Sequence, residues 1–181
     1  MRITVLVGSP RKNGNTETLA DALIEGARAA GAEVTKYTLR GRKIAPCVNC
    51  DYCQTHDRCA VADDMADVYE LLQKTDALVF ATPVYFYNMS AQLKAVLDRL
   101  YNPVRKKFPI RLTALLSVCA DDTQKAFDPL RVTFAAIEEY LGWKRAGEVT
   151  VCGLWKKGDI RGNEALEKAK ALGEKLATSH N

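Results

Sequence analysis

The sequence lacks the features that would point to a membrane or to nucleic acid. No apolar run in its 181 residues reaches membrane-spanning length, and its first residues lack the charged-then-apolar pattern of a signal peptide. It has no helix-turn-helix or zinc-finger spacing, and no basic stretch interleaved with aromatic residues. We therefore expect a cytoplasmic protein that binds neither membrane nor nucleic acid. Linkers, repeats and low-complexity segments are also missing, so we expect residues 1–181 to form a single domain.

The common catalytic motifs are missing as well. No Ser-His-Asp, HExxH or paired-carboxylate arrangement is apparent. The formal net charge of +4 is mild, and we interpret it as an ordinary solvated surface that could also attract phosphorylated ligands such as flavin or nicotinamide nucleotides. We expect both histidines to be uninvolved, His56 as a surface residue rather than a spare metal ligand and His180 as part of the tail.

The most informative stretch is the first eighteen residues. Residues 2–7 form a β-branched run typical of a buried strand, and residues 17–30 carry apolar side chains at helical spacing. The polar loop between them contains two glycines, one arginine and several hydroxyl and amide side chains, but no acidic residue. A helix N-terminus presents unpaired N–H groups and a partial positive charge, so this loop is typical of a phosphate site. The alternative is an ordinary strand-to-helix turn capped by Asn15 or Thr16.

The rest of the chain alternates between strands and helices. We expect strands at residues 2–7, 33–39, 77–82, 111–119 and 146–153, with helices at 17–30, after 64, after 90, at 123–141 with an interruption at Pro129, and at 163–178. This α/β pattern predicts a parallel sheet with helices on both faces. Ligand loops after the first and third strands favour the five-stranded flavodoxin-like order 2-1-3-4-5, in which ligands sit between the carboxyl ends of those two strands.

The second ligand loop spans residues 82–90 and holds three consecutive aromatics, Tyr85, Phe86 and Tyr87. These rings could simply cover the end of the core. However, three consecutive residues cannot all point inward, so at least one should face the crevice, where a flat ring could stack on it. Backbone N–H groups and the Asn88 amide can bond the polar edges of a heteroaromatic ring. A phosphate-binding loop beside an aromatic loop that can stack on a flat ring indicates a mononucleotide site.

These two loops carry a family resemblance. Gly-Ser-Pro-Arg-Lys-Asn-Gly-Asn-Thr at 8–16 and Pro-Val-Tyr-Phe at 83–86, followed by Ser-Ala-Gln-Leu-Lys at 90–94 and Asp-Arg at 98–99, closely resemble the NADPH-dependent FMN reductase group of flavodoxin-like proteins. The resemblance implies that bound FMN carries the chemistry with NAD(P)H as co-substrate, and that no side chain is catalytic. It implies that Ser9, Arg11, Asn13, Asn15 and Thr16 hold the FMN phosphate, and that Pro83, Val84, Tyr85, Phe86 and Asn88 line the isoalloxazine. The third flavin loop of the family would lie near residues 117–122, where no strong motif matches.

Four of the six cysteines are spaced C-x2-C-x2-C-x5-C, at Cys47, Cys50, Cys53 and Cys59. In a cytosolic protein such a cluster favours metal binding or redox chemistry over disulfides. Three interpretations remain open: a [4Fe-4S] cluster that exchanges single electrons with FMN, a structural zinc site, or free thiols in a plain two-electron reductase. The spacing resembles the compact motif of iron–sulfur flavoproteins, a subgroup of the same fold family. We expect Cys119 and Cys152, at the ends of apolar strands, to be small buried residues.

We therefore expect an FMN-dependent NAD(P)H oxidoreductase, of the flavin- or quinone-reductase type, that passes electrons to a small acceptor. The alternative is an iron–sulfur flavoprotein that acts as an electron carrier with a [4Fe-4S] cluster on the 47–59 loop and a ferredoxin as partner. A flavin-binding module without turnover is a third interpretation. The resemblance implies a homodimer or homotetramer, and exposed aromatics would support self-association at Tyr85, Phe86, Tyr87 and Tyr101.

Overall fold

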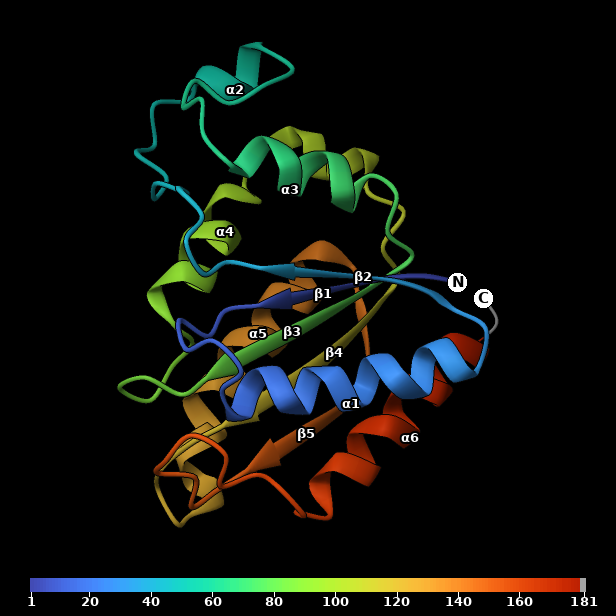
Figure 1. Cartoon of the computed structure of the whole chain (residues 1–181). Coiled ribbons are helices and arrows are strands. Elements are labelled where there is room, and N and C mark those ends of the chain that lie inside the picture. The colour runs from blue at the N-terminus through green and yellow to red at the C-terminus, as the bar shows by residue number, and fades with distance from the viewer. Residues whose placement is uncertain (180–181) are drawn as a thin grey trace.

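Five strands pair in parallel to form one sheet, in the order β2-β1-β3-β4-β5 (Figure 1). The computed structural model describes residues 1–179, so His180 lies outside the described residues. The strands are β1 (Arg2–Val7), β2 (Glu33–Thr38), β3 (Ala77–Pro83), β4 (Leu112–Val118) and β5 (Lys144–Val151). The helices are α1 (Asn15–Ala29), α2 (Tyr52–Thr55), α3 (Met65–Leu72), α4 (Ala91–Arg99), α5 (Asp128–Leu141) and α6 (Ala165–Thr178), with 3-10 turns η1 (Pro103–Lys107) and η2 (Gln124–Phe127).

Helices cover both faces of this sheet. One apolar cluster packs α1 and α6 against one face, and a second packs α3, α4 and α5 against the other (Figure 1). The central strand β3 is buried along its whole length, as expected for a parallel strand covered on both sides. The predicted flavodoxin-like α/β architecture and strand order are confirmed. Within residues 1–179, no helix is both long enough and apolar enough to cross a membrane.

Helices α1 and α6 cross at two glycines. A Cβ atom on Gly26 would lie 2.1 Å from the carbonyl oxygen of Lys170, and one on Gly173 would lie 2.1 Å from the carbonyl oxygen of Leu23. Only residues without a side chain allow the two backbones to approach so closely. This contact fixes α1 on the sheet, and with it the loop that precedes α1.

Several predicted boundaries are wrong by a few residues. Helix α1 begins at Asn15 rather than Glu17, and β5 begins at Lys144 rather than Ala146. The predicted interruption at Pro129 is a helix start, because η2 ends at Phe127 and Pro129 then occupies the first turn of α5, where its missing N–H costs nothing. Between residues 40 and 63, where the sequence predicts no strand or helix, the chain forms the four-residue helix α2.

Candidate functional site

A crevice of about 190 Å³ opens where the carboxyl ends of β1 and β3 meet. Four loops form it, each following a different strand, so residues far apart in the sequence meet at one place. Its lining comprises Ser9, Arg11, Asn15 and Thr16 after β1; Pro83, Val84 and Tyr85 at the end of β3 and after it; Val118, Cys119 and Ala120 at the end of β4 and after it; and Leu154 and Trp155 after β5.

The first two loops are tied together at Gly8. Its N–H donates to the carbonyl oxygen of Ala81 at 2.8 Å, and its carbonyl oxygen accepts a 2.7 Å hydrogen bond from the Ser90 hydroxyl. A Cβ on Gly8 would lie 2.8 Å from the Ser90 Oγ and 3.0 Å from the Cβ of Leu93, so no larger residue fits. The buried Ser90 also caps α4 by accepting from the N–H of Leu93.

The first turn of α1 presents donors to the crevice. The first hydrogen bond of the helix runs from the N–H of Thr18 to the carbonyl oxygen of Gly14. The N–H groups of Asn15 and Thr16 therefore have no acceptor within the helix. The Arg11 side chain lines the same crevice, and the loop carries the positive end of the helix dipole. This end of the crevice is suited to a phosphate group.

Glu17 organises the phosphate loop from behind, a role that the sequence analysis missed. Its carboxylate accepts 2.7 and 3.2 Å hydrogen bonds from the N–H of Asn13 and the guanidinium of Arg40, and a 3.3 Å bond from Lys36. Burial opposes ionisation of Glu17, but these three donors outweigh it and hold its pKa below the ordinary value. Its position three residues after Gly14 is the only sequence signal, because acidic residues at this point often cap a helix start.

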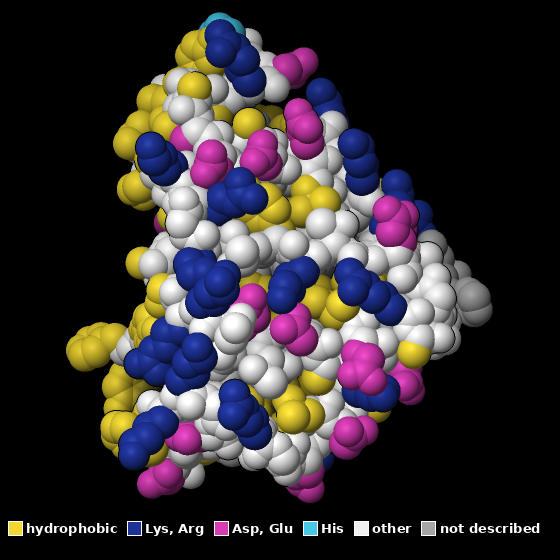
Figure 2. Space-filling view, in the orientation of Figure 1, with side chains coloured by type: hydrophobic (Ala, Val, Ile, Leu, Met, Phe, Trp, Pro, Cys, Tyr) yellow, Lys and Arg dark blue, Asp and Glu magenta, His cyan; other side chains and the backbone are white. Residues whose placement is uncertain are grey.

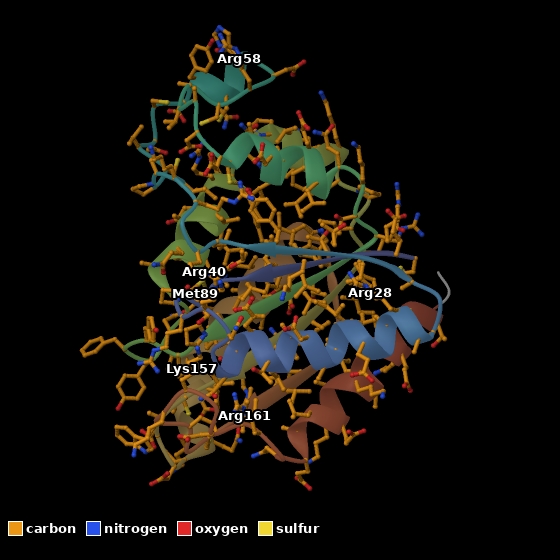
Figure 3. The ribbon with its side chains drawn as sticks, in the orientation of Figure 1. Arg28, Arg40, Arg58, Met89, Lys157 and Arg161 are labelled. Atoms are coloured by element: carbon orange, nitrogen blue, oxygen red, sulfur yellow. The ribbon has the colours of Figure 1, made fainter. Side chains whose placement is uncertain are left out.

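Lysine and arginine side chains gather around the carboxyl end of β1 and the start of α1 (Figure 2). Figure 3 places Arg40 and Lys157 on this side of the molecule, although they come from the segments after β2 and after β5. The cations suit a negatively charged ligand, because they raise its local concentration at the crevice.

Asn15 lines the crevice, and its side chain also makes hydrogen bonds to the loop after β5. Its amide nitrogen donates to the carbonyl oxygen of Lys156 at 2.9 Å, and its amide oxygen accepts from the N–H of Gly158 at 2.8 Å. The Asn15 side chain thus holds the loop after β5, which brings Leu154 and Trp155 to the crevice. Nothing local in the sequence marks this loop as part of the site.

The aromatic loop makes a tight turn with unusual backbone angles. Tyr85 and Asn88 exchange backbone hydrogen bonds, and the two residues between them have positive φ, 47° for Phe86 and 66° for Tyr87. Bulky residues adopt this conformation at a cost of about 1–3 kcal/mol each. The turn directs Tyr85 into the crevice lining and leaves Phe86 99% exposed. The Asn88 amide donates to the Thr133 hydroxyl on α5 at 3.2 Å.

The loop after β4 also reaches the crevice, at the place where the family resemblance puts a third flavin loop. Cys119 is buried there, as expected, and its burial and the neighbouring Cys152 raise the pKa of its thiol to about 12. Cys152 itself is only partly buried. Cys119 is therefore a neutral wall residue rather than a nucleophile.

The structure brings seven of the ten predicted cofactor residues to the crevice lining and leaves three outside it. Asn13 has φ 51° and contributes its N–H to Glu17, Phe86 points to solvent, and the Asn88 amide turns toward α5. The assignment of the other seven to FMN stays a prediction. The crevice fits such a ligand, because its lining combines Arg11 and the first turn of α1, which suit a phosphate, with the aromatic residue Tyr85.

The four clustered cysteines line a second cavity, together with Arg99 and Tyr101. They lie on the loop between β2 and α3, at the outer end of the molecule in Figure 1. None of them forms a disulfide, and among residues 1–179 no three His, Cys, Asp or Glu side chains are arranged as a ready metal site. The donor set fits a four-thiolate group in type and number, and binding would require the thiols to move closer together.

The comparisons with known proteins agree with the sequence motifs. Residues 1–140 match the family model described as NADPH-dependent FMN reductase. An iron–sulfur flavoprotein of Archaeoglobus fulgidus is 44% identical over 97 residues, which are 54% of this chain and 49% of the relative. The Bacillus subtilis protein YwqN, provisionally named an NAD(P)H-dependent FMN-containing oxidoreductase, is 30% identical over 95% of this chain and 96% of the relative. The chain spans about half the length of the Archaeoglobus protein.

Solved structures share the fold. An NAD(P)H:quinone oxidoreductase from Methanothermobacter marburgensis superimposes with a TM-score of 0.81, at 19% identity, and covers 100% of this chain and 98% of its own. An archaeal flavodoxin superimposes with a TM-score of 0.61, at 14% identity, over 98% of this chain and 96% of its own. At these identities the superpositions establish the flavodoxin-like architecture alone.

Proposed function

The chain belongs to the NADPH-dependent FMN reductase family, and from this premise we propose that it is an FMN-dependent NAD(P)H oxidoreductase that reduces a small acceptor, of the flavin- or quinone-reductase type. The observation that carries the proposal is the crevice between β1 and β3, whose lining combines the donors and Arg11 of the loop after β1 with Tyr85 of the loop after β3. The names of the relatives support the same chemistry.

The chain's own residues would bind and orient the cofactor. Ser9, Arg11, Thr16 and the first-turn N–H groups of α1 would hold the phosphate, since they combine hydrogen bonds with positive charge. Pro83, Val84 and Tyr85 would pack against the ring system. Bound FMN supplies hydride acceptance from a reduced nicotinamide and electron donation to the acceptor. No protein acid or base is required, in accord with the lack of a catalytic motif.

A flavin titration followed by a steady-state assay tests this proposal. We expect the protein to bind FMN and to oxidise NADH or NADPH when a quinone or free flavin is present. Negligible oxidation with every small acceptor, in a protein that binds FMN, would favour a carrier or a flavin-binding module. A protein that takes up no FMN would refute the assignment of the crevice.

The second candidate is an iron–sulfur flavoprotein that exchanges single electrons with a ferredoxin. The specific observation in its favour is that all four clustered cysteines line one cavity. Relatives named iron–sulfur flavoprotein support it as well. The visible spectrum of protein purified without oxygen separates the candidates, because flavin alone gives two bands and a cluster adds a broad shoulder beneath them. Zinc or free thiols would leave the flavin bands unchanged.

Self-association in the cytoplasm completes the proposal. Phe86 is 99% exposed and Tyr87 lies beside it, with the two rings 6.3 Å apart. Exposed aromatic pairs at the edge of a site support a homodimer or homotetramer. Light scattering of the protein and of a Phe86→Ser variant checks this. We expect the variant to be monomeric at concentrations at which the wild-type protein is still a dimer or tetramer. A wild-type protein that is monomeric at high concentration would contradict it.

A further inference from the structure

The cysteine loop is anchored to the fold through one buried arginine. Arg99 is the last residue of α4, and its side chain is only 2% exposed. One guanidinium nitrogen, Nη1, donates to Asp63 at 2.5 Å and to the carbonyl oxygen of Ala45 at 3.3 Å, and Nη2 donates to the carbonyl oxygen of Val61 at 3.1 Å. Ala45 lies two residues before the first clustered cysteine, and Val61 lies two residues after the last. The guanidinium therefore joins the two arms of the loop at its base.

The Nε donor of this guanidinium is unused. The Nε atom of Arg99 is buried and has no hydrogen-bond partner within residues 1–179. A buried donor without a partner is desolvated without compensation, so such groups are uncommon and call for a specific explanation, of which a bound ligand is one. Arg99 also lines the cavity that the four cysteines line. A buried arginine with an unpaired donor thus lines the same cavity as the four cysteines.

The anchor has its own supports. Asp63 accepts from Arg99 and from the N–H groups of Ala45 and Met65, and these bonds hold its pKa below the ordinary value although burial opposes this. The hydroxyl of Tyr69 donates to the carbonyl oxygen of Arg99 at 2.8 Å. An arginine so fixed keeps its fork in one orientation, which a flexible surface residue would not do.

We infer that Arg99 is the positioning residue of the cysteine loop: it fixes both arms of the loop and places a buried charge and a free N–H beside the thiols, where they stabilise the negative charge of a thiolate-bound iron–sulfur group. This inference rests on the second candidate function. One-electron reduction adds a negative charge to such a group, so the nearby cation favours the reduced form. Loss of the charge should therefore lower the reduction potential, whereas loss of the fork should lower the yield of assembled cluster.

Three variants separate the two effects. Arg99→Met removes charge and fork, and Arg99→Lys keeps the charge but loses the fork. Arg58→Gln is the matched control, because it removes an exposed charge next to Cys59 that lies over the Tyr52 ring, at the outer tip of the loop (Figure 3). Each protein is reconstituted with iron and sulfide without oxygen, its iron and FMN contents are measured, and its cluster is titrated with dithionite.

We expect Arg99→Met to lose at least half of its iron while it keeps its FMN, and any cluster that it holds to be at least tenfold harder to reduce, which is 59 mV for a one-electron couple. Arg99→Lys should lose iron but keep the wild-type potential, and Arg58→Gln should match the wild type in both. If Arg99→Met fails to fold, loss of FMN would reveal it. The iron content and potential of Arg99→Lys would then decide whether the inference holds.

The outcomes that overturn the inference are distinct from those that overturn the function. A wild-type protein that takes up FMN but no iron and sulfide would refute the iron–sulfur candidate and this inference together, and would leave the reductase proposal intact. A wild-type protein that holds a cluster, with Arg99 variants equal to it in iron content and potential, would refute the inference alone. Equal effects of Arg99→Met and Arg58→Gln would show that burial and position are irrelevant, and would refute it too.

Discussion

Arg11 gives the sharpest test of the phosphate seat, because its neighbour is a natural control. Both residues are exposed, but Arg11 lines the crevice, whereas Lys12, which carries the same charge one residue later, is not part of the lining. A hydrogen bond to a charged group contributes about 1.5–3 kcal/mol. At about 1.4 kcal/mol per factor of ten, Arg11→Ala should weaken FMN binding roughly 10- to 150-fold. Lys12→Ala removes only a solvent-screened charge and should cost less than about threefold.

The comparison of FMN with riboflavin makes this test specific. Riboflavin lacks the phosphate, so its affinity should be nearly equal in the wild type and in Arg11→Ala. Both dissociation constants can be measured by quenching of flavin fluorescence at a fixed salt concentration. Equal losses for FMN and riboflavin would mean that Arg11 supports the fold of the loop rather than the phosphate. An equal loss of FMN affinity in Lys12→Ala would mean that Arg11 contributes only through general electrostatics. Either result would refute the reasoning.

Three further predictions concern groups around the site. The folded-state pKa of Glu17 lies below the ordinary 4.5, so its carboxylate stabilises the fold above that pH and loses this contribution as the pH falls through the folded pKa. The difference in free energy of unfolding between wild type and Glu17→Gln, measured in urea, should therefore disappear in acid. Cys119, with a pKa of about 12, should react with iodoacetamide at pH 8 about a thousandfold more slowly than free cysteine, as mass spectrometry would show. Gly26→Ala should destabilise the protein by about 1–3 kcal/mol in urea, because its Cβ would overlap the Lys170 carbonyl, although alanine ordinarily stabilises a helix interior.

Local sequence signals were sufficient for the sheet and for two sides of the crevice. Short apolar runs that end at turn residues, such as residues 77–82 before Pro83, are typical of buried strands. The donors of residues 8–16 and the three aromatics of 85–87 stand next to such strands, so strand order alone brings them together. The prediction that at least one of these aromatics faces the crevice is confirmed, since Tyr85 lines it.

The rest of the crevice could not be predicted, because it depends on contacts between distant residues. Trp155 reaches the crevice only because Asn15 holds its loop across more than a hundred residues of sequence. The same contact occupies an amide that the sequence alone assigns to the phosphate. Asn88 turns away because Thr133 on α5 offers it an acceptor, and no local pattern reports where α5 will lie. An amide or hydroxyl near a ligand loop serves either the ligand or the fold, and only tertiary contacts decide between them.

Helix α4 connects the two candidate sites. At its start, Ser90 donates to the carbonyl oxygen of Gly8 in the phosphate loop, and at its end Arg99 holds both arms of the cysteine loop. Its nine residues span about 14 Å at 1.5 Å per residue, and its inner face is packed in the core. A long loop with few apolar contacts of its own is thus fixed at its base to the element that also shapes the crevice. Because a packed helix moves as a unit, α4 holds the base of the cysteine loop in a fixed position relative to the loop that lines the crevice.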